Sequence, residues 1–264
     1  RDSSTSRGLG DVYKRQHLFP YFLYICAICE FDIKKKKIMV YVLFIVIALV
    51  SFAVQRTLQS KFERYSKIPI PYGLTGRDIA MRMLQENGIN DVSVTQVDGH
   101  LTDHYNPATH TVNLSRDVYY GNSVAAAAVA AHECGHAVQH ARSYSFLNLR
   151  SALVPFVSFA SNWVQWILLI GILTIQAYPA IMLLGIILFA ATTLFSFITL
   201  PVEINASQRA LAWLNGAGVT DASTHDKAKD ALKWAAYTYV VAALGSLATL
   251  VYYIIIFAGG RRDS

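Results

Sequence analysis

The sequence predicts a mostly α-helical integral membrane protein with about four transmembrane helices and a small α+β, zincin-like domain. The chain has 264 residues, of which 54% are hydrophobic and only 15% charged, and its mean hydropathy is +0.35. A soluble domain of this length could hardly hide that much apolar surface from water. The second observation is that long apolar stretches recur along the chain. The third is the stretch His132-Glu133-Cys134-Gly135-His136, whose spacing is typical of a helical zinc site.

The first part of the chain differs in composition from the rest. Residues 1–16 are polar and patternless, and the first methionine is Met39. We therefore expect 1–38 to be a non-native or disordered extension, with the natural protein beginning at Met39. Cys26 and Cys29 form a C-x-x-C pair in an apolar run too short to span a membrane. No second pair accompanies them, so we expect neither a redox nor a metal role.

The membrane segments are predicted from length and from the absence of interior charge, since about 20 apolar residues cross a hydrocarbon layer of about 30 Å. The segments that qualify are 39–54, which is the shortest, 152–174, 177–200 and 235–258. A short tail, 259–264, comes after the last.

The two middle segments are predicted to form a tight helical hairpin over 152–200, because only Ile175 and Gln176 separate them. A hairpin returns the chain to the side from which it entered the membrane. Segment 55–151, the predicted zinc-peptidase domain, and segment 201–234 therefore lie on one side. A residue of the second segment can complete a metal site begun in the first.

The soluble part is predicted to mix helix and strand. A helix over 78–87, opened by a cap at Thr75 or Gly76, is followed by short strands at 91–97 and 109–114. A second amphipathic helix, 221–234, leads into the last membrane segment.

The motif itself is predicted to lie on a helix, because Ser123 can cap the alanine-rich run that precedes it. Residues four apart on a helix differ by about 40° around the axis and about 6 Å along it. His132 and His136 can therefore bind one zinc ion, while Glu133 beside them can take a proton from the water that the metal activates. Cys134 points away from that face and is expected to pack.

A catalytic zinc takes three protein ligands, so one more is needed. The candidates are Glu203, His140, His225, His104, His110 and Asp103. His140 lies about 12 Å along the helix from His132, too far to share one ion. For Glu203 the residues leave two interpretations equally open: a zinc ligand, or an acid that complements the dipole at the N-terminus of a helix after Pro201.

A wider resemblance bears on this choice. Residues 130–139, with 101–107, 150–155 and 200–207, resemble the YugP-type bacterial membrane zinc metallopeptidases, which are related in pattern to HtpX-like gluzincins. The resemblance implies zinc as cofactor, peptidase activity and Glu203 as the third ligand. In HtpX-like proteins an acidic residue often comes four positions after that glutamate; Ser207 stands there in this chain, so the partner of the zinc histidines stays unassigned.

The predicted function is that of a membrane zinc endopeptidase, with His132, His136 and Glu203 as metal ligands and Glu133 as general base. Strand 109–114 is expected to pair with an extended substrate. Possible helpers of the reaction are Tyr119, Tyr120, His104 and Arg209.

Two alternatives remain at this stage. A structural zinc site would be closed by a fourth ligand such as His140 or His104. A transporter-like bundle would carry ionisable residues inside its membrane segments.

Charge predicts the partners and the orientation. The net charge of +6 favours anionic lipid headgroups over nucleic acid, since no basic stripe with interleaved aromatics is present. The partners expected are thus a protein or peptide substrate and the lipid bilayer. Lysine and arginine flank the zinc-domain ends of the membrane segments and are missing from the hairpin tip, which predicts a multi-pass protein of the cell inner or plasma membrane with a cytoplasmic active site. The residues concerned are Arg56, Lys61, Arg64, Lys67, Arg142, Arg150, Arg209, Lys227, Lys229 and Lys233.

Overall fold

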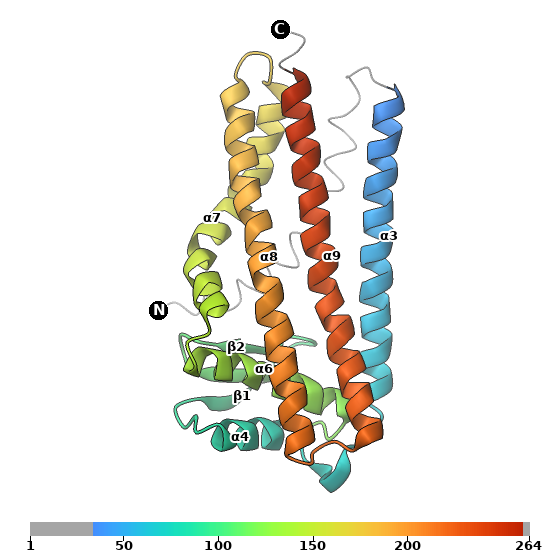
Figure 1. The fold of residues 1–264 in the computed structure, drawn as a ribbon, viewed down its shortest axis with the longest axis vertical. Coiled ribbons are helices and arrows are strands. Elements are labelled where there is room, and N and C mark those ends of the chain that lie inside the picture. The colour runs from blue at the N-terminus through green and yellow to red at the C-terminus, as the bar shows by residue number, and fades with distance from the viewer. Residues whose placement is uncertain (1–33, 261–264) are drawn as a thin grey trace. The chain divides into compact units, whose positions relative to one another are not determined.

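The computed structural model describes residues 34–260 (Figure 1). The pair Cys26 and Cys29, and most of the expected N-terminal extension, lie outside the described residues. In chain order the elements are α3 (Lys34–Tyr65), the 3-10 turn η1 (Pro71–Gly73), α4 (Gly76–Glu86), β1 (Ser93–Val97), β2 (His104–Asn106), β3 (Thr111–Ser115), α5 (Arg116–Tyr119), α6 (Val124–Ala141), α7 (Ser145–Leu173), α8 (Pro179–Gly216) and α9 (Ala222–Gly260).

Four of the described helices, α3, α7, α8 and α9, are long and apolar enough to cross a membrane. This confirms the predicted fold class. Two of them run through expected boundaries: α8 continues through Pro201, and α9 joins the predicted amphipathic helix to the last membrane segment without a break. The chain divides into two compact units.

The first unit consists of the described residues up to Ser51, Arg150–Ile198 and the described residues from Val240 onward. In it α7 and α8 form the expected hairpin (Figure 1). The two helices approach closely at two glycines. A Cβ on Gly171 would lie 2.7 Å from the Met182 Cα, and one on Gly185 would lie 2.7 Å from the Leu168 side chain. Small residues permit such close packing between membrane helices.

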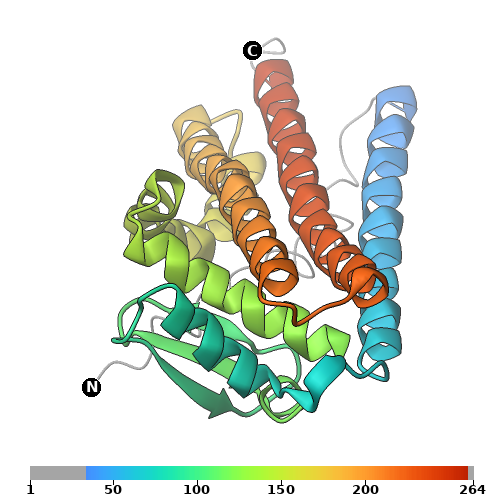
Figure 2. The ribbon, with the colours of Figure 1, turned by 60° about the horizontal axis from the view of Figure 1, so that its bottom comes forward.

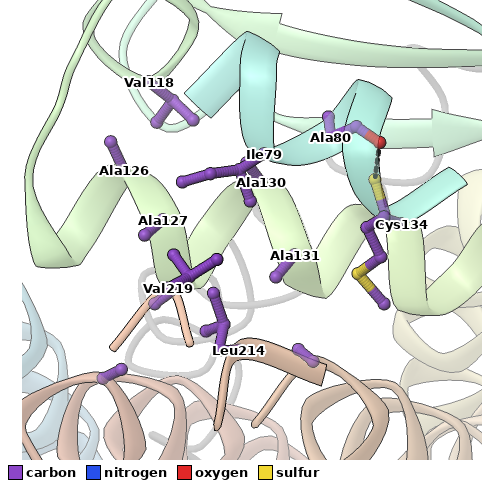
Figure 3. Packing of buried hydrophobic residues seen from close by; sticks show 14 of the residues in the cluster. Ile79, Ala80, Val118, Ala126, Ala127, Ala130, Ala131, Cys134, Leu214 and Val219 are labelled. Carbon is purple, nitrogen blue, oxygen red and sulfur yellow. Dashed lines mark hydrogen bonds between the residues drawn. The ribbon is translucent and has the colours of Figure 1, made fainter. Parts of the chain in front are cut away.

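The second unit consists of Phe52–Leu149 and Thr199–Tyr239, and α6 runs through its middle. Figure 2 shows α6 with α4 and the sheet on one side and the C-terminal part of α8 on the other. The Ser123 hydroxyl caps α6 by accepting the Ala126 N–H at 3.2 Å. Figure 3 shows why neighbours on both sides come close: the alanines of α6 leave room for Ile79 of α4 above and Leu214 of α8 below.

The sheet has three strands in the order β1-β3-β2, with β1 parallel and β2 antiparallel to β3. The predicted strand 109–114 corresponds to β3, which pairs with a neighbour on both sides. Its expected role in substrate pairing is therefore wrong, because a central strand has no open edge. The edge strand next to α6 is β2, which was not predicted.

Candidate metal centre

The three predicted ligands come together within the second unit. His132 and His136 lie one turn apart on α6, and Glu203 lies on α8; their ligand atoms all lie within 4.8 Å of one another. The Glu203 Oε2 is 3.3 Å from the His132 Nε2 and 3.5 Å from the His136 Nε2. Among the described residues, no other group of three histidine, cysteine or acidic side chains has this arrangement.

The donor set fits zinc. Two ligand atoms bound at about 2.0–2.1 Å to a tetrahedral ion are about 3.4 Å apart, and the two nitrogen–oxygen separations lie close to that value. Glu203 is only 3% exposed, and an ionised carboxylate at such a buried position is stabilised by a nearby positive charge such as a metal ion. Two imidazoles and one carboxylate leave the fourth position of a tetrahedral ion for water or substrate.

The position of Glu203 excludes one of the two interpretations that the sequence left open. Because α8 begins at Pro179 and continues through Pro201, Glu203 lies well inside a helix. The alternative role as an acid at a helix N-terminus is therefore wrong.

A glycine allows the two ligand helices to meet. A Cβ on Gly135 would lie 2.6 Å from the Ala206 carbonyl oxygen and 3.2 Å from its Cα. Any larger residue at position 135 would thus push α8 away from α6. The glycine within the motif brings Glu203 within reach of both histidines.

The outer nitrogens of the two histidines also have partners. The His132 Nδ1 lies 3.1 Å from the Ser207 hydroxyl, so the serine four residues after Glu203 fills the position that the sequence left unassigned. The His136 Nδ1 lies 3.0 Å from the Gln139 Oε1. Partners at this nitrogen orient a metal-binding imidazole. Gln139 was not among the predicted site residues.

Glu133 lies beside the triad on α6 and is 8% exposed. Its Oε2 accepts the backbone N–H of Tyr105, in β2, at 2.9 Å. Burial raises the pKa of Glu133 to about 7; the nearby Asp103 and Glu203 add to the increase, while His132 and the Tyr105 N–H oppose it. The carboxyl group is thus oriented by the edge strand.

The other candidate ligands have partners of their own. Asp103 accepts the N–H of Ser115 at 2.7 Å and its hydroxyl at 3.0 Å, and burial raises the pKa of Asp103. The remaining pairs are His104 Nδ1 with the Thr102 carbonyl at 2.8 Å, His110 Nδ1 with Asp91 at 2.6 Å, His140 Nδ1 with the Tyr105 hydroxyl at 2.8 Å and His225 Nδ1 with the Thr220 hydroxyl at 3.2 Å. None of them belongs to the metal-binding group found in the described residues.

The suggested helpers and the cysteine also have defined surroundings. Tyr119 and Tyr120 pack edge to face with their ring centroids 4.9 Å apart, and the Arg209 Nε donates to Asn205 at 2.8 Å. A role of these residues in the reaction stays a prediction. The Cys134 thiol donates to the Ala80 carbonyl at 3.6 Å on the side facing α4, as Figure 3 shows. This agrees with the packing role predicted for it, and burial raises the pKa of the thiol.

Comparison with known proteins assigns the chain to a family. Residues 40–258 match the sequence model of a family described as "putative neutral zinc metallopeptidase". The chain belongs to this family. A similar protein is the "Putative membrane protease YugP" of Bacillus subtilis (strain 168), 45% identical over 214 residues, which cover 81% of this chain and 94% of that protein. No solved structure matches the chain.

Membership in the zinc metallopeptidase family confirms the resemblance noted in the sequence and zinc as the cofactor. Together with the similar membrane protease and the four apolar helices, it makes the chain a membrane protein of a protease family. The triad of His132, His136 and Glu203 is the group in the described residues that could hold the zinc ion.

Proposed function

We propose that the protein is a membrane-embedded, zinc-dependent endopeptidase in which His132, His136 and Glu203 hold the metal and Glu133 is the general base. One observation carries the proposal: two imidazoles and a buried carboxylate meet, and Glu133 lies beside them on the helix that carries both histidines. A structural zinc closed by a fourth protein ligand has less support, because neither His140 nor His104 belongs to the metal-binding group found in the described residues.

The role proposed for each group in the reaction follows from its position. When bound, zinc supplies a Lewis acid that activates water and polarises a peptide carbonyl. Glu133 takes the proton of the attacking water and then delivers it to the leaving amine. The Tyr105 N–H holds the Glu133 carboxyl group in one orientation during both transfers.

We further propose that the substrate binds as an extended strand along β2. Tyr105 stands opposite Val112 of β3, yet its N–H is directed to Glu133 and away from β3. In an antiparallel ladder the N–H and C=O of one residue face the same side. The Tyr105 carbonyl is therefore also available at the edge next to the general base, where the backbone of a substrate can pair with it.

The site is proposed to work on the cytoplasmic side of the cell membrane. The support is the distribution of lysine and arginine, which are present near the membrane ends of the second unit and absent from the turn between α7 and α8. A reporter protein inserted at the α7–α8 turn should report a location outside the cytoplasm. A cytoplasmic signal there would reverse the orientation.

The chemistry is tested with the full chain, purified in detergent, by measuring zinc content and cleavage of fluorescent casein. We expect Glu133→Gln to keep stoichiometric zinc and to lose about 10²–10⁴-fold in cleavage rate, the contribution typical of a general base. Glu203→Ala should lose the zinc. Glu63→Gln, which changes an exposed glutamate of α3, is the matched control and should behave like the wild type. Full zinc in Glu203→Ala, with no cleavage by any form, would exclude the peptidase mechanism and favour structural zinc.

A further inference from the structure

Gln139 is a fully buried polar side chain beside the proposed metal ligands. It lies on α6 three residues after His136 and has 0% exposure. Its amide makes three hydrogen bonds: to the His136 Nδ1 at 3.0 Å, to the Val202 carbonyl at 2.8 Å and to the Asn205 Oδ1 at 3.0 Å. Burying an amide is costly unless its polar atoms are paired, and the partners here are a metal-site histidine and the helix that carries Glu203.

The orientation of this amide is determined by its neighbours. Arginine can only donate hydrogen bonds, so the Asn205 atom that meets the Arg209 Nε at 2.8 Å is an oxygen. The Gln139 atom that meets this oxygen must then be the NH₂ group. The Val202 carbonyl leads independently to the same assignment, because it too can only accept. The Oε1 of Gln139 therefore faces His136.

The consequence for His136 is a single tautomer. Because the Gln139 Oε1 can only accept, the His136 Nδ1 must carry a hydrogen. In the neutral imidazole, the form that binds a metal, Nε2 is then the unprotonated nitrogen, and it lies 3.5 Å from the Glu203 Oε2. His132 differs: its partner Ser207 has a hydroxyl that can donate or accept, so it does not fix a tautomer.

The same amide ties the two ligand helices together. Its NH₂ group donates to the carbonyl of Val202, the residue immediately before Glu203. One side chain thus selects the tautomer of a ligand on α6 and holds the backbone of α8 next to the ligand that α8 supplies.

We propose that Gln139 is a positioning residue of the metal site: it presents the unprotonated Nε2 of His136 and fixes Glu203 against it, supported from behind by Asn205 and Arg209. The inference rests on the proposed function, since it requires that His136 and Glu203 bind the metal. Partners of this kind typically contribute 10–100-fold to metal affinity.

The test is the zinc affinity of the purified full chain in detergent, measured by competition with a chelator, together with the visible absorption spectrum of the Co²⁺-loaded protein. Gln139→Leu should bind zinc about 10–100-fold more weakly and change the Co²⁺ spectrum. Gln139→Glu keeps an oxygen that accepts from the His136 Nδ1, so it should bind zinc more tightly than Gln139→Leu.

Two controls separate positioning from stability. Leu214→Ala creates a cavity in the same core, on α8, and should lower the unfolding temperature without changing the affinity or the Co²⁺ spectrum of the folded protein. Asn205→Leu changes a partly exposed residue and serves if Gln139→Leu does not fold; we expect it to weaken zinc binding about threefold or more.

The outcomes separate the role of Gln139 from the metal site itself. A folded Gln139→Leu with wild-type affinity and spectrum would overturn the inference, as would an unchanged affinity in Asn205→Leu should the leucine variant not fold. His132→Ala tests the proposed function independently: if it retained zinc, the metal site itself would be wrong. Loss of zinc in His132→Ala with no loss in Gln139→Leu would leave the metal site standing and remove only the role of Gln139.

Discussion

Replacing Gly135 by alanine should weaken zinc binding without unfolding the protein. The new Cβ would lie 2.6 Å from the Ala206 carbonyl oxygen, whereas an ordinary contact begins at 3.4 Å. The obstacle is backbone and cannot rotate away. Relief requires α6 and α8 to separate by up to the difference of these two distances, 0.8 Å. Glu203 lies less than one turn from Ala206 and would move with it.

The expected magnitude is set by the geometry of the triad. The separations of 3.3 and 3.5 Å between Glu203 and the two histidines would increase towards about 4 Å, whereas metal sites tolerate deviations of about 0.2 Å. Overpacking of this kind costs about 1–3 kcal/mol. If the cost falls on the metal site, zinc affinity decreases about 5–150-fold. Alanine also has a higher helix propensity than glycine, by about 1 kcal/mol, which partly offsets the cost to folding.

The measurement is zinc affinity by chelator competition, with thermal unfolding of the metal-free protein recorded alongside. Gly216→Ala is the matched control, since no atom lies within 4 Å of a Cβ at that helical glycine, and it should leave zinc affinity unchanged. Wild-type affinity in Gly135→Ala would refute the idea that this close approach of α6 and α8 builds the site. Complete unfolding of the variant would refute the claim that overpacking mainly lowers zinc affinity and not folding stability.

Two further predictions concern the second unit away from the metal. Thr75→Ala removes a capping box in which the Thr75 hydroxyl accepts the Asp78 N–H and the Asp78 carboxylate accepts from Thr75, and should cost about 1 kcal/mol of unfolding free energy. The Thr75 hydrogen bonds lower the pKa of Asp78. This stabilisation is therefore complete above the ordinary carboxyl pKa and is lost as the pH falls through the lowered value. If the difference in unfolding temperature between wild type and Thr75→Ala did not shrink in acid, this reasoning would be wrong. Ile79→Ala, at a fully buried position, should lower the free energy of unfolding by about 2–5 kcal/mol in denaturant titrations. Met81→Ala, on the exposed face of the same helix, should change it by less than about 0.5 kcal/mol. Equal effects would show that the core assignment is wrong.

Features with a regular local period could be predicted from the sequence. The membrane helices are indicated by apolar stretches of sufficient length, and the metal motif by the spacing of four between His132 and His136. Glu203 was harder, because it is 71 residues from His132 along the chain. Local physics could not place it beside the histidines, and only the family resemblance favoured it as the ligand. A break at Pro201 was the natural expectation, yet the helix continues.

Features that depend on tertiary contacts could not be predicted. Strand β2 has three residues, His104–Asn106, too few to show an alternating pattern. Without β2, β3 was expected to pair with the substrate. The hydrogen bond from Tyr105 to Glu133 uses a backbone N–H, so no side chain in the sequence indicates it.

Gln139 is an intermediate case, because the sequence carried a signal for it. It comes seven residues after His132, and seven residues at about 100° each return to within about 20° of the starting direction. His132, His136 and Gln139 therefore share one stripe of an otherwise alanine-rich helix, and Gly135 adjoins it. A buried helix that has its polar residues and its glycine on one stripe is expected to meet another backbone there.

The matching face of α8 shows the same pattern. Glu203, Ala206, Ser207 and Ala210 succeed one another at intervals of three, one and three residues, the spacing of a single helical face. Polar side chains of the metal site and small residues alternate on this face, as they do on α6. The small residues let the backbones approach, and the short distance lets a carboxylate from one helix reach two imidazoles of the other. Packing and chemistry at this crossing thus depend on the same residues, so enlarging its alanines or its glycine should weaken zinc binding although none of them binds the metal.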